Sequence, residues 1–123
     1  TIAISPEDPS GAPADNTLYP GLIPRAWGHL RTNGSAGLTT SSLFGCTATV
    51  TGNDIEVVLL NAMASAAYVV IPAGGDSTTR TVVAGIVDAS NFNLLAYDSA
   101  AANIDLSATA NRYIHFVVFG LQA

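Results

Sequence analysis

The sequence predicts an all-β protein, an antiparallel β-sandwich of the jelly-roll-like kind with about eight strands. Short segments rich in β-branched and aromatic residues recur about every 8 to 12 residues along the chain, and turn-forming residues separate them. The alanine-rich stretches are too short to be stable helices on their own. At 123 residues, the chain has the length of a single domain.

The first 24 residues differ from the rest, and we expect an extended N-terminal arm over residues 1–24 and a sandwich domain over residues 25–123. Five of the six prolines lie in this arm. Proline fixes φ and has no N–H to donate to a strand neighbour, so the arm is not expected to join the core sheets. Its last residues, LYPGLIP, are apolar. We therefore expect the arm to rest on a surface such as a neighbouring subunit.

The first half of the domain contains a strand, a long loop and a hairpin. Residues 25–32 (RAWGHLRT) predict the first strand, and the Gly-, Ser- and Thr-rich residues 33–42 predict a loop. Residues 43–50 and 55–60 predict a pair of strands. The residues between these two strands include Gly52 and Asn53, which tolerate the positive φ of a hairpin turn.

The second half begins with residues 61–67 (NAMASAA), which could form a short turn of helix. Further β segments are then expected, because β-branched and aromatic residues alternate with Gly-, Ser- and Asn-rich turns. These segments are residues 68–73, 81–89, 92–98, 104–109 and the terminal strand 112–120.

Two of the expected strands are apolar on both faces, whereas a strand with one wet face alternates apolar and polar side chains. We interpret the second apolar face as a contact between subunits. A covering loop or the N-terminal arm is the alternative. The expected interface residues are Val58, Leu60, Ile114, Phe116 and Val118.

Composition excludes several classes of partner. Charged residues make up 11% of the chain, lysine is absent, and the net charge is −5. The chain has four arginines and no basic run, so the basic surface that binds nucleic acid is missing. No apolar run approaches the roughly 18 residues of a spanning helix, so we expect no membrane insertion. Low charge favours a surface covered by other copies.

The sequence shows no catalytic pattern, and we expect a protein that is not an enzyme and has no cofactor. No G-x-S-x-G elbow is present, and NGSAG has the wrong glycine spacing. His29 and His115 are isolated on apolar strands, which indicates core or interface histidines and no metal site. Three copies of His115 on a three-fold axis are the alternative that could bind a metal. Cys46 lies in a β-rich run and is expected to be a buried structural thiol.

Strand parity predicts where a ligand would bind. If antiparallel strands each cross the whole sheet, successive loops alternate between the two ends of the sandwich. The end away from the arm then gathers amides and hydroxyls, which can donate and accept hydrogen bonds as sugar hydroxyls require. These expected binding residues are Asn33, Ser35, Thr40, Asn61, Asn91, Asn111 and Arg112. The opposite rim would collect Asp54, Asp76, Arg80 and Asp98.

Three stretches together resemble the C-terminal receptor-binding tip domains of bacteriophage tail fibres and related virion spikes. They are PRAWGHLRTNGS, TATVTGNDIEVVLLNAMASAAYVVIPA and RYIHFVVFG, which cover parts of residues 24–122 in the order that such domains have. The chain departs from that pattern because it lacks an aromatic residue near Glu56 and a coiled-coil or collagen-like stalk.

The resemblance implies a trimeric β-sandwich tip on the virion surface that holds host-surface saccharide and carries no catalytic residues. The alternative is a structural decoration or adaptor protein of a phage-like particle, whose N-terminal arm latches onto a neighbouring subunit or another virion protein. A third interpretation is a non-catalytic piece of a polysaccharide-cleaving spike.

Overall fold

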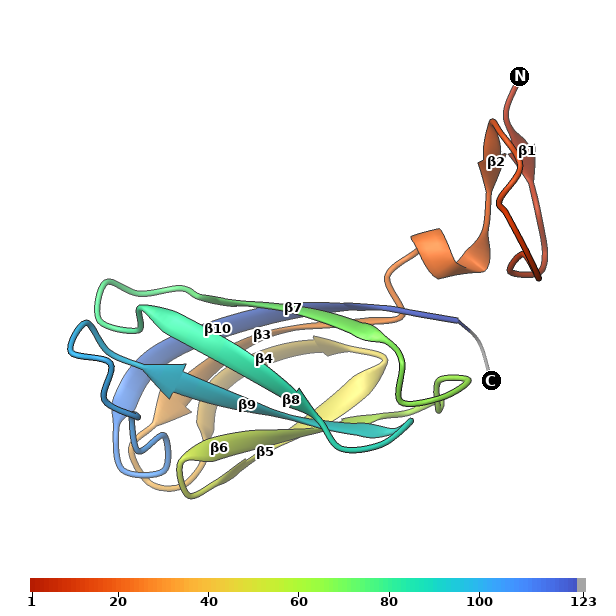
Figure 1. Cartoon of the computed structure of the whole chain (residues 1–123). Coiled ribbons are helices and arrows are strands. Elements are labelled where there is room, and N and C mark those ends of the chain that lie inside the picture. The colour runs from red at the N-terminus through yellow and green to blue at the C-terminus, as the bar shows by residue number, and fades with distance from the viewer. Residues whose placement is uncertain (122–123) are drawn as a thin grey trace.

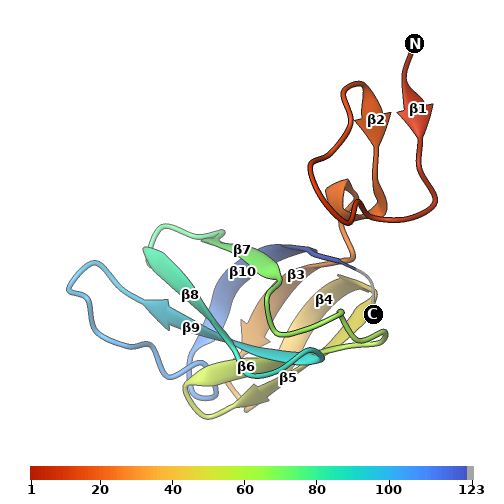
Figure 2. The same cartoon turned by 45° about the vertical axis from the view of Figure 1, so that its right-hand side comes forward.

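The computed structural model, which describes residues 1–121, confirms an all-β sandwich (Figures 1 and 2). Two four-stranded sheets face each other, and all strand pairs within them are antiparallel. Sheet 1 has the order β4 (Leu38–Phe44), β3 (Ala26–Asn33), β10 (Ala110–Phe119) and β7 (Val69–Gly74). Sheet 2 has the order β5 (Cys46–Thr51), β6 (Asp54–Leu59), β9 (Asn91–Tyr97) and β8 (Thr81–Ile86).

The chain changes sheet after β4, β6, β7 and β9, and the first of these changes occurs at Gly45. Gly45 has φ +72°, and a Cβ at this position would lie 2.6 Å from the carbonyl oxygen of Arg25. Only glycine fits such a sharp, crowded bend. The sequence predicted one continuous strand over residues 43–50. That prediction is wrong, because Gly45 divides the segment between the two sheets.

The loops gather at two ends of the sandwich. One end, where the N-terminal residues 1–24 join the sandwich and which we call the ribbon end, contains Gly45, residues 60–68, residues 87–90 and Leu121. Backbone hydrogen bonds join these segments. The distal end contains residues 34–37, the hairpin at residues 52–53, and the loops 75–80 and 98–109. In Figure 1 the distal end lies to the left, and the ribbon end lies to the right.

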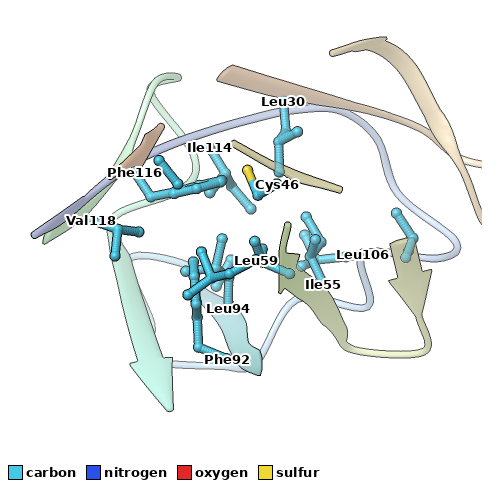
Figure 3. Close-up of a cluster of buried hydrophobic side chains, with 14 of the residues drawn as sticks. Leu30, Cys46, Ile55, Leu59, Phe92, Leu94, Leu106, Ile114, Phe116 and Val118 are labelled. Atoms are coloured by element: carbon cyan, nitrogen blue, oxygen red, sulfur yellow. The ribbon is translucent and has the colours of Figure 1, made fainter. Parts of the chain in front are cut away.

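The core fills the space between the sheets with alternate side chains from each strand (Figure 3). On β10, Ile114, Phe116 and Val118 are buried. The Phe116 ring meets Phe92 of the opposite sheet edge to face, with 5.4 Å between the ring centroids. Gly28 leaves room for this ring, because a Cβ there would lie 2.4 Å from it.

Two segments differ from the sequence prediction. Residues 104–109 form turns instead of a strand, and the side chains of Ile104 and Leu106 close the distal end of the core. Residues 61–67 form bends and no helix, and Met63 in this segment is buried. In both segments isolated apolar side chains anchor an irregular backbone to the core.

The N-terminal residues stand away from the sandwich as a small folded unit, which we call the ribbon (residues 1–24; Figures 1 and 2). Here β1 (Ala3–Ile4) pairs in parallel with β2 (Thr17–Leu18), and the 3₁₀ helix η1 (Pro20–Leu22) follows. The Asp8 carboxylate accepts a hydrogen bond from the N–H of Gly21. The expected extended arm is therefore folded back on itself.

Candidate functional site

The side of sheet 1 that faces away from the core carries large side chains from all four strands, and we call it the outer face. Along each strand its residues alternate with buried residues, and the strand register places residues of neighbouring strands beside one another. Its members are Trp27, His29, Arg31, Phe44, Val69, Ile71, Tyr113, His115, Val117 and Phe119.

The half of the outer face near the ribbon end is apolar. The rings of Trp27 and Phe44 are stacked, with 6.2 Å between centroids and an interplanar angle of 9°. Val117 pairs with Trp27 on one side and with Ile71 on the other. Trp27, Phe44 and Ile71 are each about half exposed. Contiguous exposed apolar surface of this kind marks an interaction site.

The other half of the outer face is polar and ordered by side-chain contacts. The Nδ1 atoms of His29 and His115 lie 3.0 Å apart. The Arg31 guanidinium lies over the Tyr113 ring, 5.4 Å from its centroid, and donates two hydrogen bonds to Asn111 Oδ1. The sequence indicated two isolated histidines. That interpretation is wrong, because the pairing of β3 with β10 brings two residues 86 positions apart into contact.

Asp76 ties the β7–β8 loop to β10 at the distal end. Its Oδ2 accepts hydrogen bonds of 2.8 Å from the hydroxyl of Thr79 and from the backbone N–H of Tyr113. Its Oδ1 accepts from the N–H groups of Thr78 and Thr79, and Arg112 lies 3.5 Å away. Partial burial by itself raises the pKa of Asp76, but these hydrogen bonds outweigh burial and lower the pKa to about 2.

The expected binding residues do not gather on one rim. The distal end contains Asn33, Ser35, Asn111 and Arg112, whereas the ribbon end contains Asn61 and Asn91. Thr40 lies within β4, opposite Arg31 of β3. The strand that the sequence missed, β4, reverses the parity of the later loops as far as residue 103. For the same reason Asp54, Asp76, Arg80 and Asp98 lie at the distal end, not on the opposite rim. Residues 104–109, which were expected to be a strand, form none, and this restores the predicted position of Asn111 and Arg112.

The amides that do reach the distal end hold its turns in place. Asn33 Oδ1 accepts hydrogen bonds from the N–H groups of Ser35 and Gly37, and Asn111 Oδ1 is bound to Arg31. Asn111 also has φ +61°, a conformation that asparagine tolerates better than most residues. The hydrogen bonds and backbone conformations of these turns therefore account for asparagine at both positions.

The expected interface residues divide into two groups. Ile114, Phe116 and Val118 face the core and are at most 4% exposed, so the prediction that they contact another subunit is wrong. Val58 and Leu60 are exposed on the other sheet and its following loop. The terminal strand does have a second apolar face, but this face consists of Val117 and Phe119.

Two hollows lie outside the outer face. An open cleft of about 650 Å³ at the distal end of sheet 2 contains hydrogen-bonding and aromatic groups. It is lined by Arg80, Thr81, Val83, Tyr97, Asp98, Ser99 and Ala101. A more apolar groove of about 390 Å³ lies between the ribbon and Leu121. Neither was predicted as a pocket, although Arg80 and Asp98 were expected on one rim.

The thiol of Cys46 is buried in the core. Burial of Cys46 raises the pKa of its thiol, and a hydrogen bond that the backbone of Phe44 donates to the sulfur offsets part of this rise. Within residues 1–121, His, Cys, Asp and Glu form no group of three or more that could hold a metal ion. In the same described part of the chain, no helix is long and apolar enough to cross a membrane.

Comparisons of this chain with protein-family models, with curated proteins and with solved structures found no match. The resemblance to phage fibre tips therefore stays a prediction from the three sequence stretches that carry it.

Proposed function

We propose that this chain is a non-enzymatic tip domain of a virion fibre or spike and that it works as a homotrimer on the particle surface. The observation that carries the proposal is the apolar half of the outer face, where Trp27, Phe44, Val69 and Ile71 are exposed side by side. Low charge content supports the same conclusion, because 11% charged residues is about half the usual fraction. The number of subunits rests on the resemblance to trimeric tips.

The energetic scale fits an assembly interface. Full burial of one large apolar side chain contributes roughly 1.5 to 3 kcal/mol, so the half-exposed side chains contribute about 1 kcal/mol each. Two facing patches of four such residues give about 8 kcal/mol, which lies within the estimated cost of association of about 4 to 15 kcal/mol. A stable trimer therefore also needs contacts from the rest of the outer face or from the ribbon.

The distal cleft is the surface that we assign to host-surface saccharide within this proposal. It lies at the end of the sandwich away from the ribbon, where a tip domain would meet its receptor. Tyr97 supplies an aromatic ring, and Arg80, Asp98 and Ser99 supply donors and acceptors for sugar hydroxyls. This cleft replaces the amide rim that strand parity predicted.

The test of assembly compares two matched substitutions by sedimentation velocity and light scattering. Ile71→Asp places a charge on the outer face, and Val83→Asp places the same charge on the edge strand of sheet 2. The two side chains are similarly exposed, at 54% and 45%. We expect wild type and Val83→Asp to be trimers and Ile71→Asp to be a monomer with an unchanged β-sheet circular dichroism spectrum. A wild type that is monomeric at micromolar concentration contradicts the proposal.

The ribbon supports a second candidate function, a decoration or adaptor protein that latches onto a neighbour. Ile2, Ile4, Leu22 and Ile23 are all more than half exposed on this unit, which projects from the sandwich (Figure 1). Both edges of its two-stranded sheet are also open to strand addition. Deletion of residues 1–24 separates the two functions. Loss of particle stability with normal host adsorption favours the adaptor, and loss of adsorption with stable particles favours the fibre tip.

A further inference from the structure

The pair formed by His29 and His115 has the arrangement of a small chelating site. The two residues are direct cross-strand partners on β3 and β10, and both side chains point to the outer face. Their rings lie with centroids 5.0 Å apart and are only partly buried, so the pair is open to solvent. We propose that His29 and His115 bind a divalent transition-metal ion such as Zn²⁺ through their Nδ1 atoms.

The separation of the two nitrogens suits a shared metal ion. Zinc binds imidazole nitrogen at about 2.0 to 2.1 Å, so two ligands at a tetrahedral angle lie about 3.3 Å apart. The observed Nδ1–Nδ1 distance is 3.0 Å. Small rotations of the two rings therefore convert the present contact into coordination, with no movement of the strands.

The surroundings hold both rings in this orientation. A Cβ at Gly75 would lie 2.6 Å from Nε2 of His115, so the Nε2 edge of that ring packs against the Gly75 backbone. The Tyr113 ring lies 6.0 Å from the His29 ring. Placement on two hydrogen-bonded strands limits the motion of both ligands, which favours chelation over binding by either ring alone.

The nearest cationic side chain on the same face has other partners. Arg31 lies two residues beyond His29, and its guanidinium is bound to Asn111 Oδ1 and covers the Tyr113 ring. Imidazole suits Zn²⁺, Cu²⁺ and Ni²⁺ better than Mg²⁺ or Ca²⁺, which prefer oxygen ligands. Two protein ligands leave the other coordination positions to water or to a second molecule.

Metal binding requires a change of tautomer that can be measured. In the free neutral pair, one ring carries its proton on Nδ1 and donates it to Nδ1 of the other ring, which carries its own proton on Nε2. A metal ion bound to both Nδ1 atoms requires both rings to carry their protons on Nε2. One proton thus moves from Nδ1 to Nε2 of the same ring, with no net proton release.

The test uses the full chain with ¹⁵N-labelled histidine, titrated with zinc chloride and followed by long-range ¹H–¹⁵N NMR. The chain has two histidines, so every imidazole signal belongs to this pair. We expect both Nδ1 resonances to shift, both rings to become Nε2–H tautomers, and chelation of the zinc by EDTA to reverse the change.

Substitutions give a second readout by calorimetric titration with zinc chloride. His29→Gln and His115→Gln should each weaken zinc binding about ten-fold or more, because two-point chelation becomes one-point binding. Glu56→Gln, which removes an exposed carboxylate from β6 of sheet 2, should leave the affinity unchanged. The proposal is overturned if zinc at millimolar concentration leaves both rings unchanged, if coordination is through Nε2, or if affinity survives in both glutamine variants. If a glutamine variant does not fold, the wild-type tautomer change decides alone.

Discussion

Replacement of Asp76 by asparagine is expected to destabilise the sandwich by about 2 kcal/mol. The substitution keeps one oxygen but places an NH₂ group where the second carboxylate oxygen accepts from Thr79 and Tyr113. The N–H of Tyr113 then loses its acceptor inside the β7–β10 junction. An unsatisfied buried donor costs about 1 to 3 kcal/mol.

The pKa gives an independent value for the same contribution. Asp76 has a pKa of about 2 in the folded protein, against an ordinary value of 3.8. At about 1.4 kcal/mol per pKa unit, this difference corresponds to about 2.5 kcal/mol. The side chain is 15% exposed. Solvent screening reduces the contribution, so about 2 kcal/mol remains.

The pH dependence follows from the direction of this shift. Because folding lowers the pKa of Asp76, its contribution to stability is fully present above pH 3.8 and is lost as the pH falls through about 2. The free energy of unfolding of wild type should therefore fall in this range by about 2 kcal/mol more than that of Asp76→Asn.

Urea denaturation of both proteins at neutral pH and at intervals down to pH 2 measures the two effects. Asp98→Asn is the matched control, because Asp98 accepts from the N–H groups of Ala100 and Ala102 within one exposed loop and holds no second strand. We expect this control to lose much less stability than Asp76→Asn. Equal losses in the two variants, or equal pH dependence of wild type and Asp76→Asn, would refute the role assigned to Asp76.

Two further predictions concern the core. Gly28→Ala should cost about 1 to 3 kcal/mol, because the new methyl group meets the Phe116 ring, which Phe92 supports from the other side. Gly85→Ala on β8 is the control, since a Cβ there has no heavy atom within 4 Å. Thermal melts measure both variants, and equal losses of stability in the two would contradict the explanation. Cys46→Ala should remain folded and lose about 1 kcal/mol by leaving a small cavity. In the folded wild type, Cys46 should react with iodoacetamide far more slowly than in the protein unfolded by urea. Equal reaction rates in the two states would contradict its burial.

The fold class and the main hairpin could be predicted from local pattern alone. Apolar and β-branched residues in short, evenly spaced segments require sheets that cover each other, and the sandwich confirms this. Gly52 and Asn53 form the turn between β5 and β6 at the expected place. Both predictions depend on properties of neighbouring residues, which the sequence contains directly.

The position of the loops could not be predicted, because one strand was read as a loop. Residues 38–42 are Leu-Thr-Thr-Ser-Ser, a composition that occurs in loops as readily as in strands. Tertiary pairing with β3 makes them part of β4, and Gly45 then sends the chain to the other sheet. This one extra strand moves Asn61 and Asn91 to the end opposite Asn33.

The sequence by itself determined that β10 is apolar on both faces, but only the tertiary structure decided which face is the core. Ile114, Phe116 and Val118 are no more apolar as a set than Val117 and Phe119 with their neighbours, so alternation cannot rank the two faces. The register with β3 and β7 buries the first set and leaves the second on the outer face. The same register brings His29 and His115 into contact. The sequence could not predict this contact, because contacts between distant strands depend on how the whole chain packs and not on any local pattern.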